Sequence, residues 1–196
     1  MLGLCLMMAG ATAQALPQEE DAMIYYQSHW NKSVRLLTRD SADFIGLPYP
    51  YSTPTLAGNM MFQEMYYWDT YFINRGLIAY GSHPQRRGES TVNEKLALTQ
   101  ALNNVNNLIY LVNKLGYAPN ANRYSMTNRS QPPLLGAMIN DIFSVTKDTA
   151  WLRQALLALE KEHQWWMLDR SLGLSPREYD GVQMDKSAPH AMKLNF

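Results

Sequence analysis

Apolar residues recur at every third or fourth position along most of the chain, which is the spacing of amphipathic helices. The clearest run covers 91–115, begins with a capping box formed by Thr91 and Glu94, and ends at Gly116. No stretch of the sequence alternates apolar and polar residues in the manner of a strand. The pattern therefore predicts an all-α fold. The apolar positions of this run are Leu98, Ala101, Leu102, Val105, Leu108, Ile109, Val112 and Leu115.

Shorter helices are predicted on both sides of this run. They are expected over 22–38, from the aromatic stretch at 62–72 to about Tyr80, over 134–146, and from Asp148 or Thr149 onward. Pro132 and Pro133 fit the first turn of the helix at 134–146. The inward face of the last helix is predicted to carry Leu152, Leu156, Leu159, His163, Trp166 and Met167.

The helices favour a ring of antiparallel helix pairs. Segment 134–145 is apolar on more than one side, which is typical of helices inside a layered helical assembly. No period of the tetratricopeptide or related kind repeats along the chain, and this argues against a solenoid. Long polar loops at one end of such a ring would build a pocket.

The first fifteen residues, MLGLCLMMAGATAQA, have the pattern of a signal peptide. An apolar run from Leu2 to Ala9 is followed by small residues with A-x-A spacing. The alternative is a buried N-terminal helix, and the run is too short to span a bilayer. Cleavage would remove Cys5, the only cysteine, which suits export to the periplasm or the extracellular space.

Composition narrows the classes of partner. Hydrophobic residues make up 46% of the chain and aromatic residues 11%, which excludes a disordered polypeptide. Seventeen basic residues balance seventeen acidic ones, so nucleic acid is not an expected partner. The four histidines lack metal-ligand spacing, and no phosphate loop or nucleophile elbow occurs. We expect a monomer without metal or organic cofactor and without a membrane span.

The stretch FQEMYYWDTYF, residues 62–72, could form one wall of a sugar site. Trp68 offers a flat ring to the C–H face of a pyranose, and Asp69 can accept hydrogen bonds from two neighbouring hydroxyls. Adjacent helical residues point about 100° apart, so both would reach one ligand at a helix end or bend. The alternative interpretation is that Trp68, Tyr71 and Phe72 are core residues and that Asp69 is a satisfied buried acid.

A second polar cluster lies in the loop NANRYSMTNRSQPP, residues 120–133. Arg129 could hold a hydroxyl or carboxylate through two parallel N–H bonds. Ser130 could instead be only a helix N-cap, and the whole loop could simply be solvated. The amide, hydroxyl and guanidinium side chains gathered here are Asn120, Asn122, Arg123, Asn128, Arg129, Ser130 and Gln131.

Glu64 and Asp69 are a poor catalytic pair. Acid–base cleavage of a glycosidic bond needs carboxyls on opposite sides of that bond, roughly 5 to 10 Å apart, and these two lie on one predicted helix. Glu64 is therefore predicted to brace the loop or to orient Arg123 or Arg129. His163 lies on an apolar stripe and is predicted to be a hydrogen-bonded core histidine.

The two motifs resemble signatures of glycoside hydrolase family 37, the trehalases. FQEMYYWDTYF is similar to the pattern Arg-Phe-x-Glu-x-Tyr-x-Trp-Asp-x-Tyr. PNANRYSMTNRSQPP is similar to Pro-Asn-Gly-Asn-Arg followed by Arg-Ser-Gln-Pro-Pro. The resemblance covers about 44–170 and implies an (α/α)6 toroid and an inverting glycosidase that uses one Asp as acid and one Glu as base. By position it implies sugar contacts from Trp68, Asp69, Asn120, Arg129, Ser130 and Gln131.

The sequence departs from this family at two points. Met61 stands where the pattern has Arg, which opens the choice between trehalose and a related α-glucoside as the small-molecule substrate. The family's Arg-Pro-Glu motif, its Gly-x-Asp segment with the acid and its late region with the base have no counterpart. No catalytic residue is therefore assigned in this chain, which we expect to be truncated and inactive alone.

The combined prediction is a trehalase-like glycosidase in four segments. Residues 1–15 form a signal peptide, 16–43 a helical lead-in, 44–175 the N-terminal part of an (α/α)6 barrel, and 176–196 an irregular, truncated tail. The substrate would be a disaccharide or another α-glucoside. Two alternatives stay open, a related inverting α-glucosidase on the same barrel and a non-catalytic sugar-binding helical protein.

Overall fold

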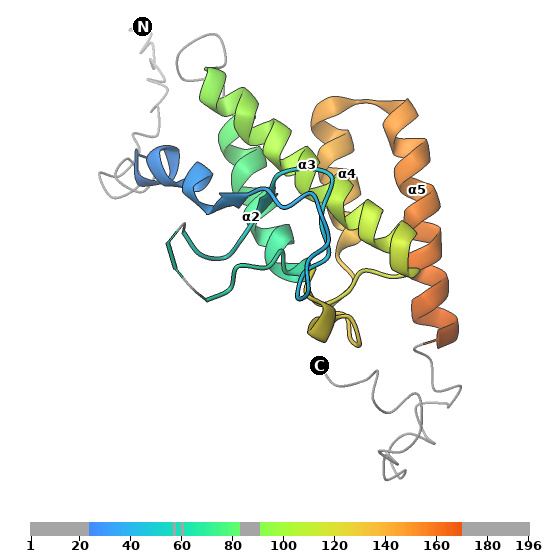
Figure 1. Cartoon of the computed structure of the whole chain (residues 1–196). Coiled ribbons are helices and arrows are strands. Elements are labelled where there is room, and N and C mark those ends of the chain that lie inside the picture. Colours follow the sequence, from blue (N-terminus) through green and yellow to red (C-terminus); the bar gives the residue numbers. More distant parts are fainter. Residues whose placement is uncertain (1–23, 57, 60, 83–90, 170–196) are drawn as a thin grey trace, which may run out of the picture.

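The computed structural model describes residues 24–56, 58–59, 61–82 and 91–169, and these are mostly helical (Figure 1). The predicted signal peptide and the predicted tail lie outside the described residues. The main helices are α2 (Tyr67–Gly81), α3 (Val92–Leu115), α4 (Leu135–Thr146) and α5 (Thr149–Gln164). The shorter elements are a helix over 24–29, the 3-10 helices η1 (Trp30–Ser33) and η3 (Tyr124–Met126), the strands β1 (Val34–Arg35) and β2 (Tyr51–Ser52), and the π-helical turn η4 (Trp165–Asp169).

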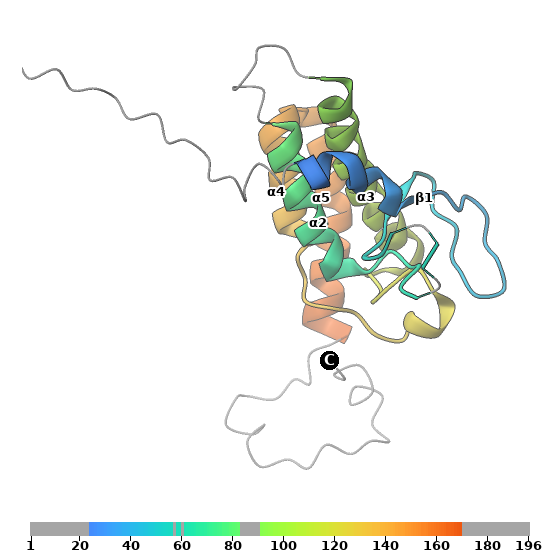
Figure 2. The same cartoon turned by 90° about the vertical axis from the view of Figure 1, so that its left-hand side faces the viewer.

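The four main helices form two antiparallel pairs, α2 with α3 and α4 with α5 (Figure 1, Figure 2). Helix α3 packs against α2, α4 and α5, and the side chains between them form one hydrophobic core. The loop over 45–51 adds Ile45, Leu47 and Tyr51 to that core. The all-α prediction is confirmed, and closure of the helix pairs into a toroid stays a prediction.

Helix α3 begins and ends where the sequence predicts. The Thr91 hydroxyl accepts a hydrogen bond from the Glu94 N–H, and the Glu94 carboxylate accepts one from the Thr91 N–H. At the other end Gly116 adopts a left-handed backbone with φ of 88°, and its N–H donates to the Val112 carbonyl. These two caps satisfy backbone groups that a helix end otherwise leaves without partners.

A row of buried amides on α3 was not predicted from the sequence. Asn104 has no exposed surface and uses its whole amide. Its oxygen accepts from the Ser52 N–H at 2.9 Å and from Gln100, and its nitrogen donates to the Ser52 hydroxyl and to Asn74 on α2. One turn further on, the Asn107 amide both accepts from the Tyr49 N–H and donates to the Tyr49 carbonyl. The irregular loop before α2 is thus fixed to α3.

The N-terminal segment differs from its prediction. Helical structure ends at Ser33, and β1 then pairs antiparallel with β2, so Val34 lies opposite Ser52 and Arg35 opposite Tyr51. A helix through residue 38 was therefore wrong. The physical reason is that β2 offers an extended segment with which residues 34–35 pair, whereas in a helix their backbone groups would have to be paired within the helix.

The inward face predicted for α5 is confirmed in part and wrong in part. Leu152 and Leu159 pack against the core as predicted. The structure buries Ala155, Ala158 and Glu162 and then Trp165. Leu156 is 42% exposed, Met167 is 59% exposed, and His163 is exposed, so His163 is not a core histidine. Alanines bring α5 close to its neighbours, and Leu159 packs where a Cβ at Gly136 of α4 would lie 3.6 Å away. Small residues therefore decide the buried face here, more than the large apolar ones.

The start of α4 also differs from its prediction. Pro132 and Pro133 precede α4, which begins at Leu135, so they are not in its first turn.

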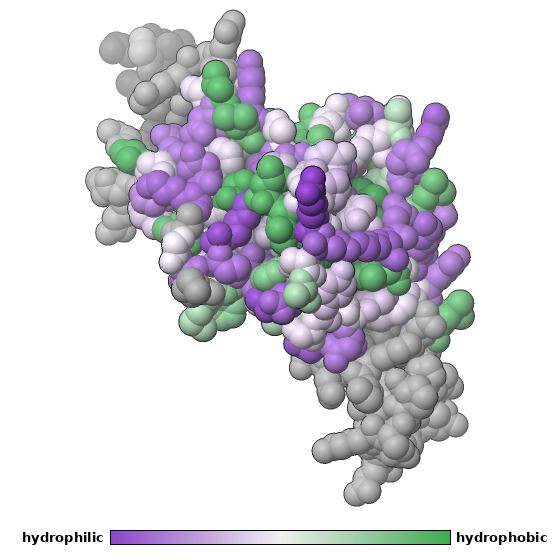
Figure 3. All heavy atoms as spheres, in the orientation of Figure 1, coloured by the Kyte–Doolittle hydropathy of each residue, from purple (hydrophilic) through white to green (hydrophobic). Residues whose placement is uncertain are grey.

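The face seen in Figure 3 mixes hydrophilic side chains with small separate hydrophobic clusters. Within the described ranges no helix has the length and apolar character needed to cross a membrane.

Candidate functional site

The start of α2 is held by the second motif. The helix begins at Tyr67, whose N–H donates to the Asn120 carbonyl at 3.1 Å. The next N–H, that of Trp68, donates to the side-chain oxygen of Gln131 at 2.9 Å. The first N–H groups of a helix lack partners within the helix, so residues distant in sequence complete this one. Trp68 and Asp69 consequently lie in the first turn, at a helix end as the sequence analysis required.

The loop that supplies these partners is itself tied together. The Asn120 N–H donates to the Arg129 carbonyl at 2.8 Å, so the two ends of the loop lie side by side. The hydroxyl of Ser130, which is buried, donates to the Gln131 carbonyl. The Arg129 guanidinium donates to the neighbouring Asn128 side chain. Backbone and side-chain bonds thus bring Trp68, Asn120, Arg129 and Gln131 to one region.

Trp68 and Asp69 differ in their surroundings. The Trp68 ring is 44% exposed and meets the Phe72 ring edge to face, with centroids 6.1 Å apart. Partial burial raises the pKa of the Asp69 carboxyl, while hydrogen bonding from its own backbone N–H and from Trp68 acts in the opposite direction. An accessible indole face beside a carboxylate is suited to a ligand with both C–H and hydroxyl surfaces.

Glu64 and Arg123 form an ion pair that connects the two motifs, as predicted for Glu64. The Arg123 Nε and the Glu64 Oε1 are 2.5 Å apart, and Glu64 is 4% exposed. The Tyr66 hydroxyl donates to the other carboxylate oxygen, and the Arg123 guanidinium lies 4.3 Å from the Phe44 ring centroid. Burial, followed by the nearby Glu64 charge, raises the pKa of Tyr66 to about 12. Glu64 is therefore occupied with a structural ion pair.

Asn122 adds a second connection across the same region. Its side-chain oxygen accepts from the Met65 N–H at 2.8 Å, and its nitrogen donates to the Ile45 carbonyl at 3.0 Å. The residue is fully buried. Its amide therefore joins three backbone segments that are far apart in the sequence. The sequence pattern assigns Asn122 to the polar cluster but does not indicate this structural role.

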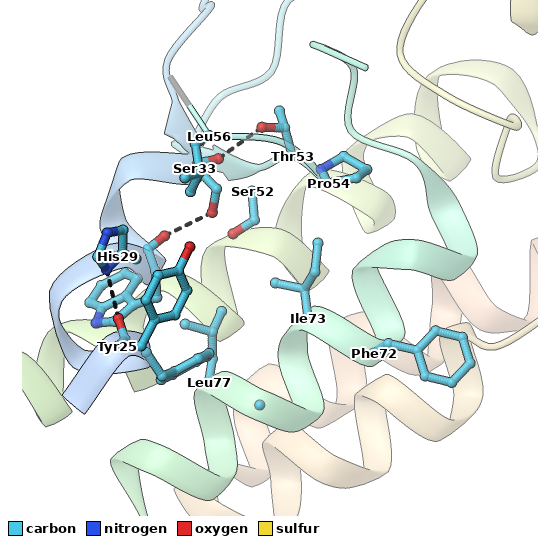
Figure 4. A pocket seen from close by; sticks show the side chains of 13 residues that line it. Tyr25, His29, Ser33, Ser52, Thr53, Pro54, Leu56, Phe72, Ile73 and Leu77 are labelled. Carbon is cyan, nitrogen blue, oxygen red and sulfur yellow. Dashed lines mark hydrogen bonds between the residues drawn. The ribbon is translucent and has the colours of Figure 1, made fainter. Parts of the chain in front are cut away.

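Two hollows of the described chain lie elsewhere. One, of about 250 Å³, lies between the N-terminal helical segment, the stretch after β2 and α2 (Figure 4). Figure 4 shows Tyr25 and His29 on one side and Phe72 on the other. A second, of about 410 Å³, lies beside β1. The six predicted sugar-contacting residues line neither of these two hollows.

One buried hydrogen bond, between Tyr67 and Glu162, was not predicted from the sequence. The Tyr67 hydroxyl donates to the Glu162 carboxylate of α5 at 2.6 Å, and Glu162 is 2% exposed. The sequence EKEHQWWM carries no sign of which acid turns inward, because the apolar pattern favoured His163. Only the small residues Ala155 and Ala158, seven and four residues before Glu162, mark the buried face.

Comparisons with known proteins agree with the two motifs. The family model named Trehalase matches residues 11–193. The chain is 35% identical to a trehalase of Apis mellifera over 138 residues, 70% of this chain and 18% of that protein. It is 38% identical to a trehalase of Arabidopsis thaliana over 128 residues, 65% of this chain and 18% of that protein. It is 30% identical to a periplasmic trehalase of Xanthomonas campestris over 182 residues, 92% of this chain and 27% of that protein.

The two motifs that meet at the start of α2 thus lie in a chain whose matched relatives are glycosidases named trehalases. The chain belongs to the trehalase family. It spans only 18% to 27% of the length of the three relatives described above.

Proposed function

We propose that this chain supplies the glucose-binding part of a trehalose-hydrolysing glycosidase. The observation that carries the proposal is the pair of hydrogen bonds from Tyr67 to Asn120 and from Trp68 to Gln131, which join the two family motifs at one helix start. Family membership gives that shared region its chemical interpretation. The proposed contacts are Trp68, Asp69, Asn120, Arg129, Ser130 and Gln131.

Four of these groups have a definite task in this proposal. The Trp68 ring stacks on the C–H face of a glucose unit, and the Asp69 carboxylate accepts from adjacent hydroxyls. Because the Gln131 oxygen is already bound to the Trp68 N–H, its NH2 group is the part that donates to the sugar. The Arg129 guanidinium exchanges its bond to Asn128 for a bidentate bond to the ligand.

The proposed reaction is inverting hydrolysis by water. One carboxylic acid protonates the leaving oxygen, and one carboxylate deprotonates the attacking water on the opposite face of the sugar ring. Neither group is assigned here, since Glu64 is held by Arg123 and Asp69 is proposed to bind sugar hydroxyls. We therefore propose that the 196-residue chain binds sugar without hydrolysing it.

The proposal also includes a substrate and a cellular location. Met61, at the position of the family's Arg, is 62% exposed and offers no hydrogen-bond donor to a second glucose unit. A related α-glucoside is thus the alternative to trehalose, and a non-catalytic sugar-binding protein is the alternative to an enzyme. Export to the periplasm or beyond is supported by the signal-like start and by the similarity to a periplasmic trehalase.

Isothermal titration of the purified chain tests this proposal. Trehalose should bind, and Trp68→Ala should weaken binding about tenfold, because a stacked ring contributes about 1 to 3 kcal/mol. Leu157→Ala, at another exposed apolar residue, serves as the control and should leave the affinity unchanged. Maltose binding more tightly than trehalose would favour the α-glucoside alternative.

Two results would contradict the proposal. If neither trehalose nor maltose binds, the six residues do not form a glucose site in this chain. If the chain releases glucose from trehalose and Asp69→Asn abolishes that release, the acid and base are present after all. A cellobiose titration, with its β-linkage, checks that any binding is specific for the α-linked sugar.

A further inference from the structure

One buried phenol, that of the residue before Trp68, joins three helices. Tyr67 has no exposed surface and is the first residue of α2. Its hydroxyl donates to the Glu162 Oε1 near the end of α5, at 2.6 Å, and accepts from the Leu135 N–H at the start of α4, at 2.9 Å. The phenol therefore uses both its donor and an acceptor position.

Glu162 is an unexpected residue for this place. It is 2% exposed on the face of α5 that otherwise buries Ala155 and Ala158. Burying a carboxyl costs free energy, and an apolar residue of the same size would fill the space at less cost. Burial raises the pKa of Glu162 to about 7, while the Tyr67 hydrogen bond acts in the opposite direction. Packing alone therefore does not account for an acid here.

The position of this contact also links the start of α2 to the start of α4. Tyr67 precedes Trp68, and Leu135 follows Gln131 by four residues that include two prolines. Fixing Tyr67 to Leu135 thus sets the start of α2 against the start of α4. The Trp68 N–H and the Gln131 oxygen, which are 2.9 Å apart, lie on those two segments.

We propose that Glu162 is a positioning residue for the sugar site, acting through Tyr67 to hold Trp68 and Gln131 in their mutual register. Glu162 touches neither of these two residues in this role. By accepting the phenol hydrogen it orients the Tyr67 oxygen lone pair toward the Leu135 N–H. The consequence for sugar binding rests on the function proposed above, whereas the consequence for register does not.

Exchange of the Trp68 backbone N–H with deuterated solvent tests the register without any sugar. Glu162→Met removes the acceptor and keeps the volume, and it should speed this exchange about tenfold, the loss expected for one hydrogen bond to an ionisable group. Glu162→Gln retains an acceptor oxygen and should leave the exchange near that of the unmodified chain. Tyr67→Phe should reproduce the effect of Glu162→Met.

A matched control separates positioning from general loosening. Leu159→Ala weakens the packing of α5 against α4 without touching Tyr67, and it should not speed Trp68 exchange selectively. If it speeds that exchange as much as Glu162→Met does, Glu162 has only a structural role. Equal exchange in the unmodified chain and Glu162→Met would also overturn the proposal.

Trehalose titration then links register to binding. The Glu162→Met chain should bind about tenfold more weakly than the Glu162→Gln chain. If the unmodified chain binds no sugar but the exchange results hold, the proposed function fails and the positioning role stands. If trehalose binds equally to all variants, the positioning role fails and the proposed function stands.

Discussion

The buried carboxyl of Glu162 makes the stability of the fold depend on pH in a calculable way. Its pKa is about 7 in the folded chain and 4.5 when exposed, so the folded state binds more protons between these values. The stabilisation from the protonated acid is complete below pH 4.5 and is lost as the pH rises through about 7. At 1.36 kcal/mol per pKa unit, the full loss is about 3 kcal/mol.

Urea unfolding at pH 5 and pH 8 measures this effect. Glu162→Gln abolishes the titration and keeps an acceptor for Tyr67, so it should remove roughly 2 kcal/mol of the stability difference between the two pH values. The comparison with the unmodified chain cancels the contributions of other titrating groups. The control is Glu160→Gln, an exposed acid on the same helix, which should leave the difference unchanged.

One result would refute this reasoning. If the unmodified chain and Glu162→Gln lose the same stability between pH 5 and pH 8, the carboxyl does not titrate in that window. The acid would then be solvated or paired in a way that its 2% exposure and its hydrogen bond with the Tyr67 phenol do not provide. The inference about its burial would fall with it.

Three further predictions concern the packing of the main helices. Asn104→Ala leaves the Ser52 N–H and the Asn74 oxygen without their partner in the core. It should lower the free energy of unfolding by about 3 kcal/mol. The control is Asn113→Ala, at an exposed amide of the same helix, which should change the free energy of unfolding by less than about 0.5 kcal/mol. Both are measured by urea unfolding, and equal losses would contradict the role of the amide row. A Cβ at Gly81 would lie 2.5 Å from Leu98, so Gly81→Ala should destabilise by about 1 to 3 kcal/mol. Gly136→Ala, where a Cβ meets only ordinary contacts, should stabilise by about 0.5 to 1 kcal/mol, and a loss of thermal stability there would contradict the packing of α5.

Local signals in the sequence were sufficient where the interactions are themselves local. The capping box of Thr91 and Glu94 and the stop at Gly116 were predicted because each depends on residues within one helical turn. The cap at Asp148, which accepts from the Ala150 and Trp151 N–H groups, is of the same kind. The helical class follows directly from these elements.

The sequence-based predictions were wrong where residues distant in the chain determine the local structure. The buried face of α5 depends on how closely α3 and α4 approach it, so alanines outweighed Leu156 and Met167. The end of the first helix depends on β2, which lies sixteen or more residues further on. No periodicity within either segment carries that information.

The sequence selected residues that the structure brings together, but it did not show how they are joined, and their role in sugar binding stays a prediction. Motif resemblance selected Trp68, Asn120 and Gln131, but it did not reveal that Gln131 caps the helix bearing Trp68. The Glu64–Arg123 pair was among the options that the sequence left open. Glu162 was missed because its partner lies 95 residues away.

The amides of α3 hold the preceding loop by its main chain, and this has a consequence for sequence divergence. Asn107 and Asn104 bond the peptide groups of Tyr49 and Ser52, so the path of the loop is specified with little contribution from the Tyr49 side chain, which is 43% exposed. That position can accumulate substitutions, or accept grafted ones, while the scaffold beneath keeps its shape.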